Sequence, residues 1–222
     1  MGLELVALDL ETTGFAVDDE VTVVGFALPL GCRVFARVPP CGSRVGDVEA
    51  AVREQAGTHV IVSLHASEAE LLEAVGVFAA ERLHGEDVLL VAFNGERWRG
   101  GFDLPFLRTR LAVLDVAWPF RELPYADLLP VVDRRFNTTV DGEDRSDLVG
   151  VYSTLTDGAL NALDPFDESV KAVAAWEAGR VVDVVLHNVA DIRRTRALGV
   201  LTERYCSKSD YDLKSLTPTI HD

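Results

Sequence analysis

The first third of the chain alternates apolar and polar residues in a way that predicts β-strands. Residues two apart on a strand share a face, so this alternation gives each strand one buried face. Gly31 and Cys32 are expected to form a short turn between two of the strands, which makes an antiparallel meander. The strands expected in this part of the chain cover residues 3–12, 21–30, 33–38 and 59–64.

Helical spacing of apolar residues appears further along the chain. Ser67 and Glu70 match a capping box, in which each side chain bonds the other residue's backbone amide, and the helix behind them is expected to reach Leu83. A buried strand follows over 87–93, and Pro105 suits the first turn of the next helix, which runs to Leu114. Further helices are expected over 125–136, 168–178 and 181–199.

The order of elements predicts an α/β fold with a mixed sheet flanked by helices, because antiparallel strands come first and strands then alternate with helices. A polar region spans 137–168, with Asp164-Pro165 as the expected start of a helix. We expect one domain over 1–206 and a loosely held polar tail over 207–222. No apolar run reaches the length of a membrane span, so no membrane partner is expected.

The charge balance and the cysteine content bear on the expected source and cellular compartment of the protein. The 222 residues carry a net charge of −15, and only three of the 21 basic residues are lysines. Such a surface repels nucleic acid on average and suits a protein solvated in concentrated salt, so we hypothesise a halophilic source. Arginine in place of lysine also has a simpler explanation in a GC-rich genome. The three scattered cysteines fit no disulfide framework, which favours a reducing, cytoplasmic compartment.

Three short segments carry candidate chemistry. Asp9 and Glu11 share one face of an otherwise apolar strand, where their repulsion would be relieved by a divalent cation; a solvated strand end explains the same two acids equally well. Asp103 lies where a helix is expected to begin, and taken alone it is best interpreted as the N-cap of that helix. His187 and Asp191, four apart on a helix, share a face, and such a pair alone is more often structural.

In this order the segments resemble the DEDD family of 3′–5′ exonucleases, which have a ribonuclease-H-like fold. The resemblance rests on Asp9-Leu10-Glu11-Thr12-Thr13-Gly14, on Asn94 with Phe102-Asp103-Leu104-Pro105-Phe106-Leu107, and on His187 with Asp191. It covers residues 3 to about 201 and is strongest toward the proofreading domain of family B DNA polymerases and its stand-alone relatives. One departure is that the family's histidine branch places His five residues before the last Asp, whereas its tyrosine branch uses the four-residue spacing found here.

The resemblance implies a chemistry and a partner. Asp9, Glu11, Asp103 and Asp191 would bind two Mg²⁺ or Mn²⁺ ions, and His187 would be the general base toward the attacking water. The partner would be single-stranded nucleic acid or a 3′ end. The residues assigned to substrate binding are Thr12, Asn94, Phe102, Arg97 and Trp98, of which Trp98 could stack on a base or simply anchor its loop. A small basic rim is expected from Arg97, Arg99, Arg108 and Arg110.

Two alternatives stay open at this point. An endonuclease of the ribonuclease-H-like class, cutting RNA in hybrids or branched DNA, would use similar metal chemistry. A non-catalytic nucleic-acid-binding domain on the same fold would have lost metal ligands, and none of the four acids is missing.

Overall fold

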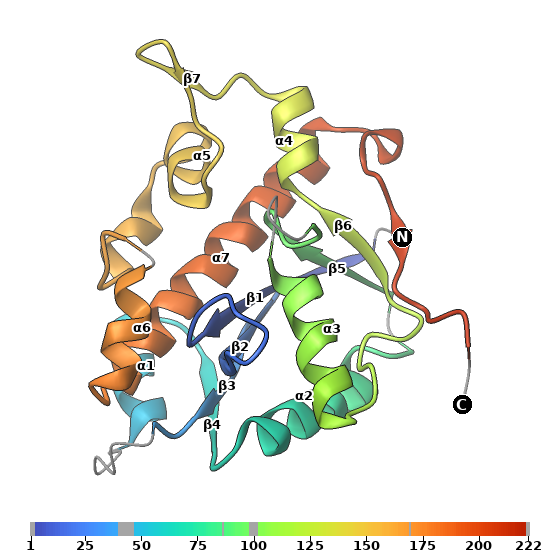
Figure 1. Cartoon of the computed structure of the whole chain (residues 1–222). Coiled ribbons are helices and arrows are strands. Elements are labelled where there is room, and N and C mark those ends of the chain that lie inside the picture. Colours follow the sequence, from blue (N-terminus) through green and yellow to red (C-terminus); the bar gives the residue numbers. More distant parts are fainter. Residues whose placement is uncertain (1–2, 40–46, 86, 98–101, 169, 221–222) are drawn as a thin grey trace.

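In the computed structural model the chain forms one mixed β-sheet with helices on both faces (Figure 1). The structure describes residues 3–39, 47–85, 87–97, 102–168 and 170–220. The sheet has the order β4-β3-β2-β1-β5-β6-β9. Its strands are β1 (Glu4–Thr12), β2 (Val21–Leu28), β3 (Gly31–Arg37), β4 (Val60–His65), β5 (Val88–Ala92), β6 (Pro124–Asp127) and β9 (Lys214–Ser215).

The strands of this sheet are antiparallel at the start of the chain and then parallel, as the sequence predicts, until the short β9 pairs antiparallel with β6. β2 is antiparallel to β1 and to β3, whereas β5 is parallel to β1 and to β6. A separate ribbon pairs β7 (Thr139–Val140) with β8 (Glu143–Asp144). The expected α/β fold with a mixed sheet flanked by helices is confirmed.

The helices form two layers that bury opposite faces of β1. Leu5 and Ala7 belong to the core under the long helix α7, whereas Val6, Leu8 and Leu10 belong to the core under α2 and α3. In Figure 1, α7 runs across one face of the sheet with α1, α5 and α6 beside it. The helices are α1 (Val48–Ala56), α2 (Glu68–Arg82), α3 (Asp103–Leu114), α4 (Leu129–Arg135), α5 (Leu148–Leu155), α6 (Val170–Glu177) and α7 (Val181–Tyr205), with 3₁₀ turns η1 (Ala159–Leu163) and η2 (Lys208–Asp210).

The β2–β3 turn lies two residues earlier than expected. Leu28 pairs with Gly31, so Pro29-Leu30 forms the turn and Gly31-Cys32 begins β3. A Cβ on Gly31 would lie 2.4 Å from the carbonyl oxygen of His59, and this close approach explains why glycine opens the strand.

Several expected helices differ in type or extent. The segment 125–136 was expected to be one helix, but it contains the end of strand β6 and helix α4. Helix α3 begins at Asp103 rather than near Pro105. Helices α1 and α5 were not predicted, and α6 starts at Val170, so Asp164-Pro165 is not a helix start.

The C-terminal segment is held against the sheet, contrary to the expectation of a loose tail. β9 pairs with β6, Leu216 is buried, and the indole of Trp118 donates a hydrogen bond to the Leu216 carbonyl (2.9 Å). Figure 1 shows this segment running along β6, which makes β9 the edge strand on this side of the sheet. No helix within the described residues is long and apolar enough to cross a bilayer.

Candidate active site

Asp9 and Glu11 project from the face of β1 that packs against α7, in line with Leu5 and Ala7. The side chain of Glu11 is 11% exposed, and burial is the largest cause that raises the pKa of Asp9 well above its ordinary value. The interpretation of these acids as a solvated strand end is therefore wrong.

Asp103 reaches the same end of β1 from the opposite helical layer. It is the first residue of α3 rather than its N-cap; Phe102 occupies the cap position and makes no side-chain cap bond there. A Cβ on Gly95 would lie 2.6 Å from Oδ2 of Asp103, so only glycine leaves room for this carboxylate. Asp103 is 6% exposed.

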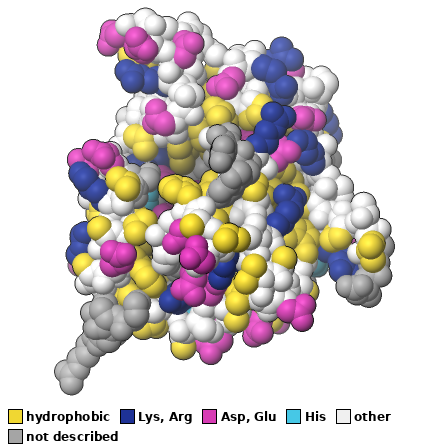
Figure 2. Space-filling model, in the orientation of Figure 1, with side chains coloured by type: hydrophobic (Ala, Val, Ile, Leu, Met, Phe, Trp, Pro, Cys, Tyr) yellow, Lys and Arg dark blue, Asp and Glu magenta, His cyan; other side chains and the backbone are white. Residues whose placement is uncertain are grey.

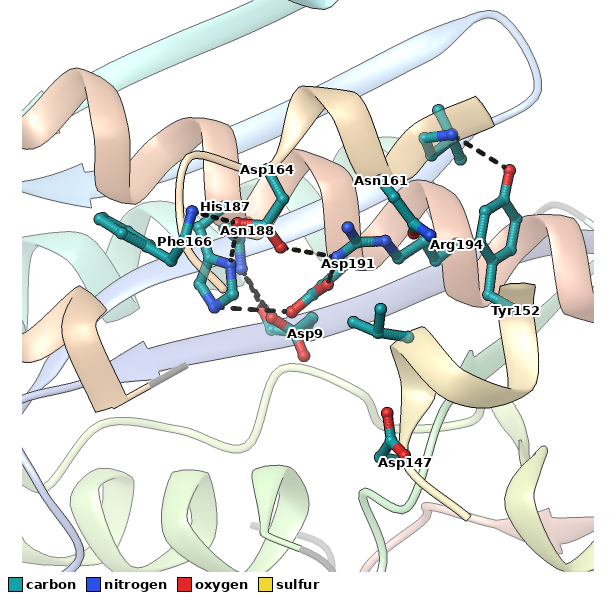
Figure 3. Close-up of polar contacts among 12 residues, drawn as sticks. Asp9, Asp147, Tyr152, Asn161, Asp164, Phe166, His187, Asn188, Asp191 and Arg194 are labelled. Atoms are coloured by element: carbon teal, nitrogen blue, oxygen red, sulfur yellow. Dashed lines mark hydrogen bonds and ion pairs between the residues drawn. The ribbon is translucent and has the colours of Figure 1, made fainter. Parts of the chain in front are cut away.

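Helix α7 supplies the third group of side chains. His187, Asp191 and Arg194 recur at helical spacing along one side of the helix. Figure 3 shows His187 and Asp191 pointing toward Asp9, and Arg194 turned toward Asp164 and Asp191. Figure 3 shows the carboxylate of Asp191 beside that of Asp9, and the charge of Asp191 is among the causes that raise the pKa of Asp9. The side chain of Asp191 is 13% exposed.

Asn188 ties α7 to β1. Its amide nitrogen donates to Oδ2 of Asp9 (2.9 Å) and approaches the Asp9 carbonyl (3.3 Å) (Figure 3). Gly25 of β2, which is paired with Asp9, has no side chain to block this approach: a Cβ there would lie 1.9 Å from Oδ1 of Asn188. Neither Asn188 nor Gly25 was singled out from the sequence.

Asp164 was expected only to begin a helix, but it lies in the site. Its Oδ1 is 2.8 Å from Nδ1 of His187, and its Oδ2 accepts a hydrogen bond from Arg194 (2.7 Å). Arg194 also donates to Oδ1 of Asp191. One buried guanidinium therefore joins the two carboxylates on either side of the histidine.

The pKa values of the four acids are all raised. Burial, together with the neighbouring carboxylates, raises the pKa of Glu11 to about 7 and that of Asp103 to about 8, and the pKa values of Asp9 and Asp191 are also raised, chiefly by burial. Burial by itself would lower the pKa of His187, but the Glu11 charge and the Asp164 bond raise it to about 9. A bound divalent cation would lower all of these pKa values, because it stabilises carboxylates and repels a proton from imidazole.

A second loop is fixed next to Asp103. Asp127 accepts hydrogen bonds from the backbone amides of Asn94 (2.8 Å) and Glu96 (3.2 Å). Asn94 has a left-handed backbone (φ 59°), as a turn residue before Gly95 would. The structure thus gives Asn94 a turn role, and its contact with substrate stays a prediction.

The other residues assigned to substrate differ in their surroundings. The hydroxyl of Thr12 donates to the carbonyl of Gly14 (2.8 Å). Phe102 contacts the ring of Phe15, which is 70% exposed, with ring centroids 5.0 Å apart. Arg97 is exposed, whereas Trp98 and Arg99 lie outside the described residues. Phe15 was not singled out from the sequence.

The prediction of a basic rim is wrong for Arg110. Arg110 is buried and makes two hydrogen bonds to Glu68 of α2, at 2.9 and 2.7 Å, so its charge is neutralised inside the protein. Arg108 is exposed, and its guanidinium lies 5.0 Å from the ring of Trp118.

Comparisons with known proteins add no family assignment. No family model matches the chain, and no curated protein is significantly similar to it in sequence.

Proposed function

We propose that this protein is a metal-dependent 3′–5′ exonuclease that hydrolyses phosphodiester bonds of DNA or RNA. The observation that carries the proposal is the convergence of four acids from three separate elements at one end of β1. They are Asp9 and Glu11 of β1, Asp103 of α3 and Asp191 of α7. The pKa of each is raised, chiefly by burial, and titratable groups perturbed in this way are typical of functional sites.

The fold supports this proposal. The antiparallel meander followed by parallel strands is what the resemblance to DEDD exonucleases implies. We propose in addition that this sheet is of the ribonuclease-H-like type.

The donor set fits divalent cations that prefer oxygen ligands. Carboxylate oxygens are the ligands of Mg²⁺ and Mn²⁺, and two such ions would offset the mutual repulsion of Asp9, Glu11 and Asp103. Bound there, they would supply Lewis-acid activation of water and stabilise the leaving 3′ oxygen. Neutralising the acids would also let a phosphodiester approach a protein of net charge −15.

The chain's own residues would position these groups. Asn188 holds one oxygen of Asp9, and Arg194 holds one oxygen of Asp191, so the remaining oxygens are left to face the cluster. The exposed ring of Phe15, supported by Phe102, offers an apolar surface on which a terminal base could stack.

Basic side chains gather away from the acidic loop that follows β1. Figure 2 shows Lys and Arg side chains over α4 and the C-terminal segment, on the same visible face as that loop. The exposed cations of these elements include Lys208 of η2 and Arg134 and Arg135 of α4, of which Arg135 is paired with Asp210 (2.7 Å). We assign this stretch to the phosphates of the incoming strand, since phosphate contacts position nucleic acid without reading its sequence.

The deciding experiment compares single-stranded oligonucleotides labelled at the 5′ or the 3′ end, incubated with Mg²⁺ or Mn²⁺. A 3′–5′ exonuclease shortens the 5′-labelled strand stepwise and releases the 3′ label as a mononucleotide at once. Asp9→Asn is the inactive control, and Asp87→Asn, a change at an exposed residue before β5, is the active one.

Other outcomes would replace the proposal. Internal fragments from both labels would indicate the endonuclease alternative. Binding of the oligonucleotide without cleavage under either metal would indicate a non-catalytic nucleic-acid-binding domain.

A further inference from the structure

His187 places a ring nitrogen inside the acid cluster. The residue is 3% exposed, and its Nε2 lies 3.7 Å from Oδ2 of Asp191 and 4.0 Å from Oε1 of Glu11. Both distances are too long for a hydrogen bond, and Nε2 has no hydrogen-bond partner among the described residues. Nε2 therefore faces the two carboxylates and is available to a ligand that is not part of the chain.

The opposite nitrogen of the ring is fixed. Nδ1 is bonded to Asp164, whose second oxygen is held in turn by Arg194 (Figure 3). A carboxylate on one nitrogen of a histidine is the usual outer partner of a metal-binding imidazole, because it sets the ring orientation and leaves the other nitrogen free for the metal.

The separations around Nε2 suit one shared ion. Ligand atoms about 2.0–2.2 Å from the same cation lie roughly 3–4.3 Å from each other, depending on the angle between them. The two contacts of Nε2, at 3.7 and 4.0 Å, fall within this range. Asp191 can take part because Arg194 occupies its other oxygen, Oδ1.

We propose that His187 binds a divalent cation directly through Nε2, together with Glu11 and Asp191, rather than acting as the general base. An imidazole ligand suits first-row transition ions better than Mg²⁺, so this position would prefer Mn²⁺. The proposal concerns the site to which we assign exonuclease activity, but it predicts metal binding that is measurable without any substrate.

Electron spin echo spectroscopy of bound Mn²⁺ tests this proposal, because it detects a coordinated nitrogen. The wild-type protein with one equivalent of Mn²⁺ should show nitrogen coupling, and labelling its histidines with the heavy nitrogen isotope should change that coupling. The labelled protein has the wild-type fold, so this measurement is decisive even if a variant is unstable. Bound Mn²⁺ without histidine nitrogen coupling would overturn the proposal, as would the failure of Mn²⁺ to bind.

Variants locate the nitrogen and measure its effect. His187→Gln should lose the coupling and weaken Mn²⁺ binding in calorimetry on the order of 10–100-fold, while changing Mg²⁺ binding less. His59→Gln is the matched control, since His59 lies by the β2–β3 turn at the other end of β1. Coupling that persists in His187→Gln, or equal losses for both metals, would count against His187 as the selective ligand.

The outcome is separable from that of the proposed function. A protein that trims 3′ ends but shows no nitrogen coupling would keep the exonuclease assignment and lose this inference. A protein that shows the coupling but cleaves no nucleic acid would keep this inference and lose the exonuclease assignment.

Discussion

His187 and Asp164 form a buried pair, with Nδ1 of the imidazole 2.8 Å from Oδ1 of the carboxylate, although 23 residues separate them. Both side chains are 4% exposed. The pair joins the loop after η1 to α7 and sets which nitrogen of His187 faces Glu11. The loop that carries Asp164 therefore fixes the orientation of the His187 ring.

Asp164→Ala should destabilise the protein by about 1–3 kcal/mol, because Arg194 and His187 each lose a buried hydrogen-bond partner while Asp191 still pairs with Arg194. Asp164→Asn keeps an acceptor for His187 and should cost clearly less. Urea unfolding of both variants measures the difference. Equal and small losses would show that this pair contributes little to stability.

Asp9→Asn should abolish hydrolysis while leaving the metal-free fold intact or more stable by about 1 kcal/mol, since it removes one of several crowded, partly buried charges. EDTA should abolish activity reversibly. Product release from end-labelled strands and thermal melting measure the two effects. Full activity of Asp9→Asn, or hydrolysis that persists in EDTA, would end the metal-dependent mechanism.

The stability of the metal-free protein should fall as pH rises. Burial raises the pKa of Glu11 from 4.5 to about 7 and that of Asp103 from 3.8 to about 8, so between these limits the folded state holds more protons than the unfolded state. Stability contributed by the protonated forms is therefore complete below about pH 4 and is lost progressively up to about pH 8.

Melting temperatures measured from pH 5 to pH 8 without metal test this sign. Glu11→Gln should flatten the profile, because the substituted side chain does not titrate. Saturating Mg²⁺ or Mn²⁺ should reverse the slope, since cations bind the deprotonated carboxylates. A metal-free profile that rises over this range would contradict the crowding of the four acids.

Residues with a strong local signal were placed correctly from the sequence. The alternation of 3–12 gave β1, and the Ser67 cap gave α2, where the Ser67 hydroxyl accepts from the Glu70 amide as expected. The Glu70 carboxylate bonds the amide of Ala66 rather than that of Ser67. The acids of the site lie on a strand and on helices whose apolar residues are regularly spaced. For this reason the sequence could predict that these acids lie close together.

Residues whose role depends on tertiary contacts could not be found in this way. Asp164 belongs to a polar stretch with no periodicity, and only the packing of η1 on α7 brings it to His187. Residues 124–127 are too short to show strand alternation, so β6 was predicted as part of a helix. Gly25 gives no signal at all until Asn188 is seen against it.

The buried ion pair between Arg110 and Glu68 should matter for stability and not for nucleic-acid binding. Glu68 also accepts a hydrogen bond from the amide of Val21 (2.8 Å), so the pair fastens α2 and α3 to the start of β2. Arg110→Ala should cost about 3–5 kcal/mol, because it leaves a buried carboxylate without its cation. Denaturant unfolding measures this loss, and Arg108→Ala, which changes an exposed residue of the same helix, should cost far less.

Gly25→Ala should misplace α7 and so reduce activity from a position that bears no functional group. The new methyl would lie 1.9 Å from Oδ1 of Asn188 and 3.2 Å from Ile192, so the helix must shift or the amide must turn away from Asp9. Such overpacking costs about 1–3 kcal/mol, and a displacement near 1 Å of His187 and Asp191 could lower kcat on the order of 10²-fold.

The matched control for Gly25→Ala is Gly76→Ala in α2, where a Cβ would meet nothing within 4 Å. That change should stabilise the protein by about 0.5–1 kcal/mol, because alanine favours a helix interior over glycine, and should leave activity unchanged. Adding Asn188→Ala to Gly25→Ala makes room for the methyl, so the double variant should be more stable than the sum of the two single changes allows. Strict additivity would show that the contact between β2 and α7 is not what Gly25 protects.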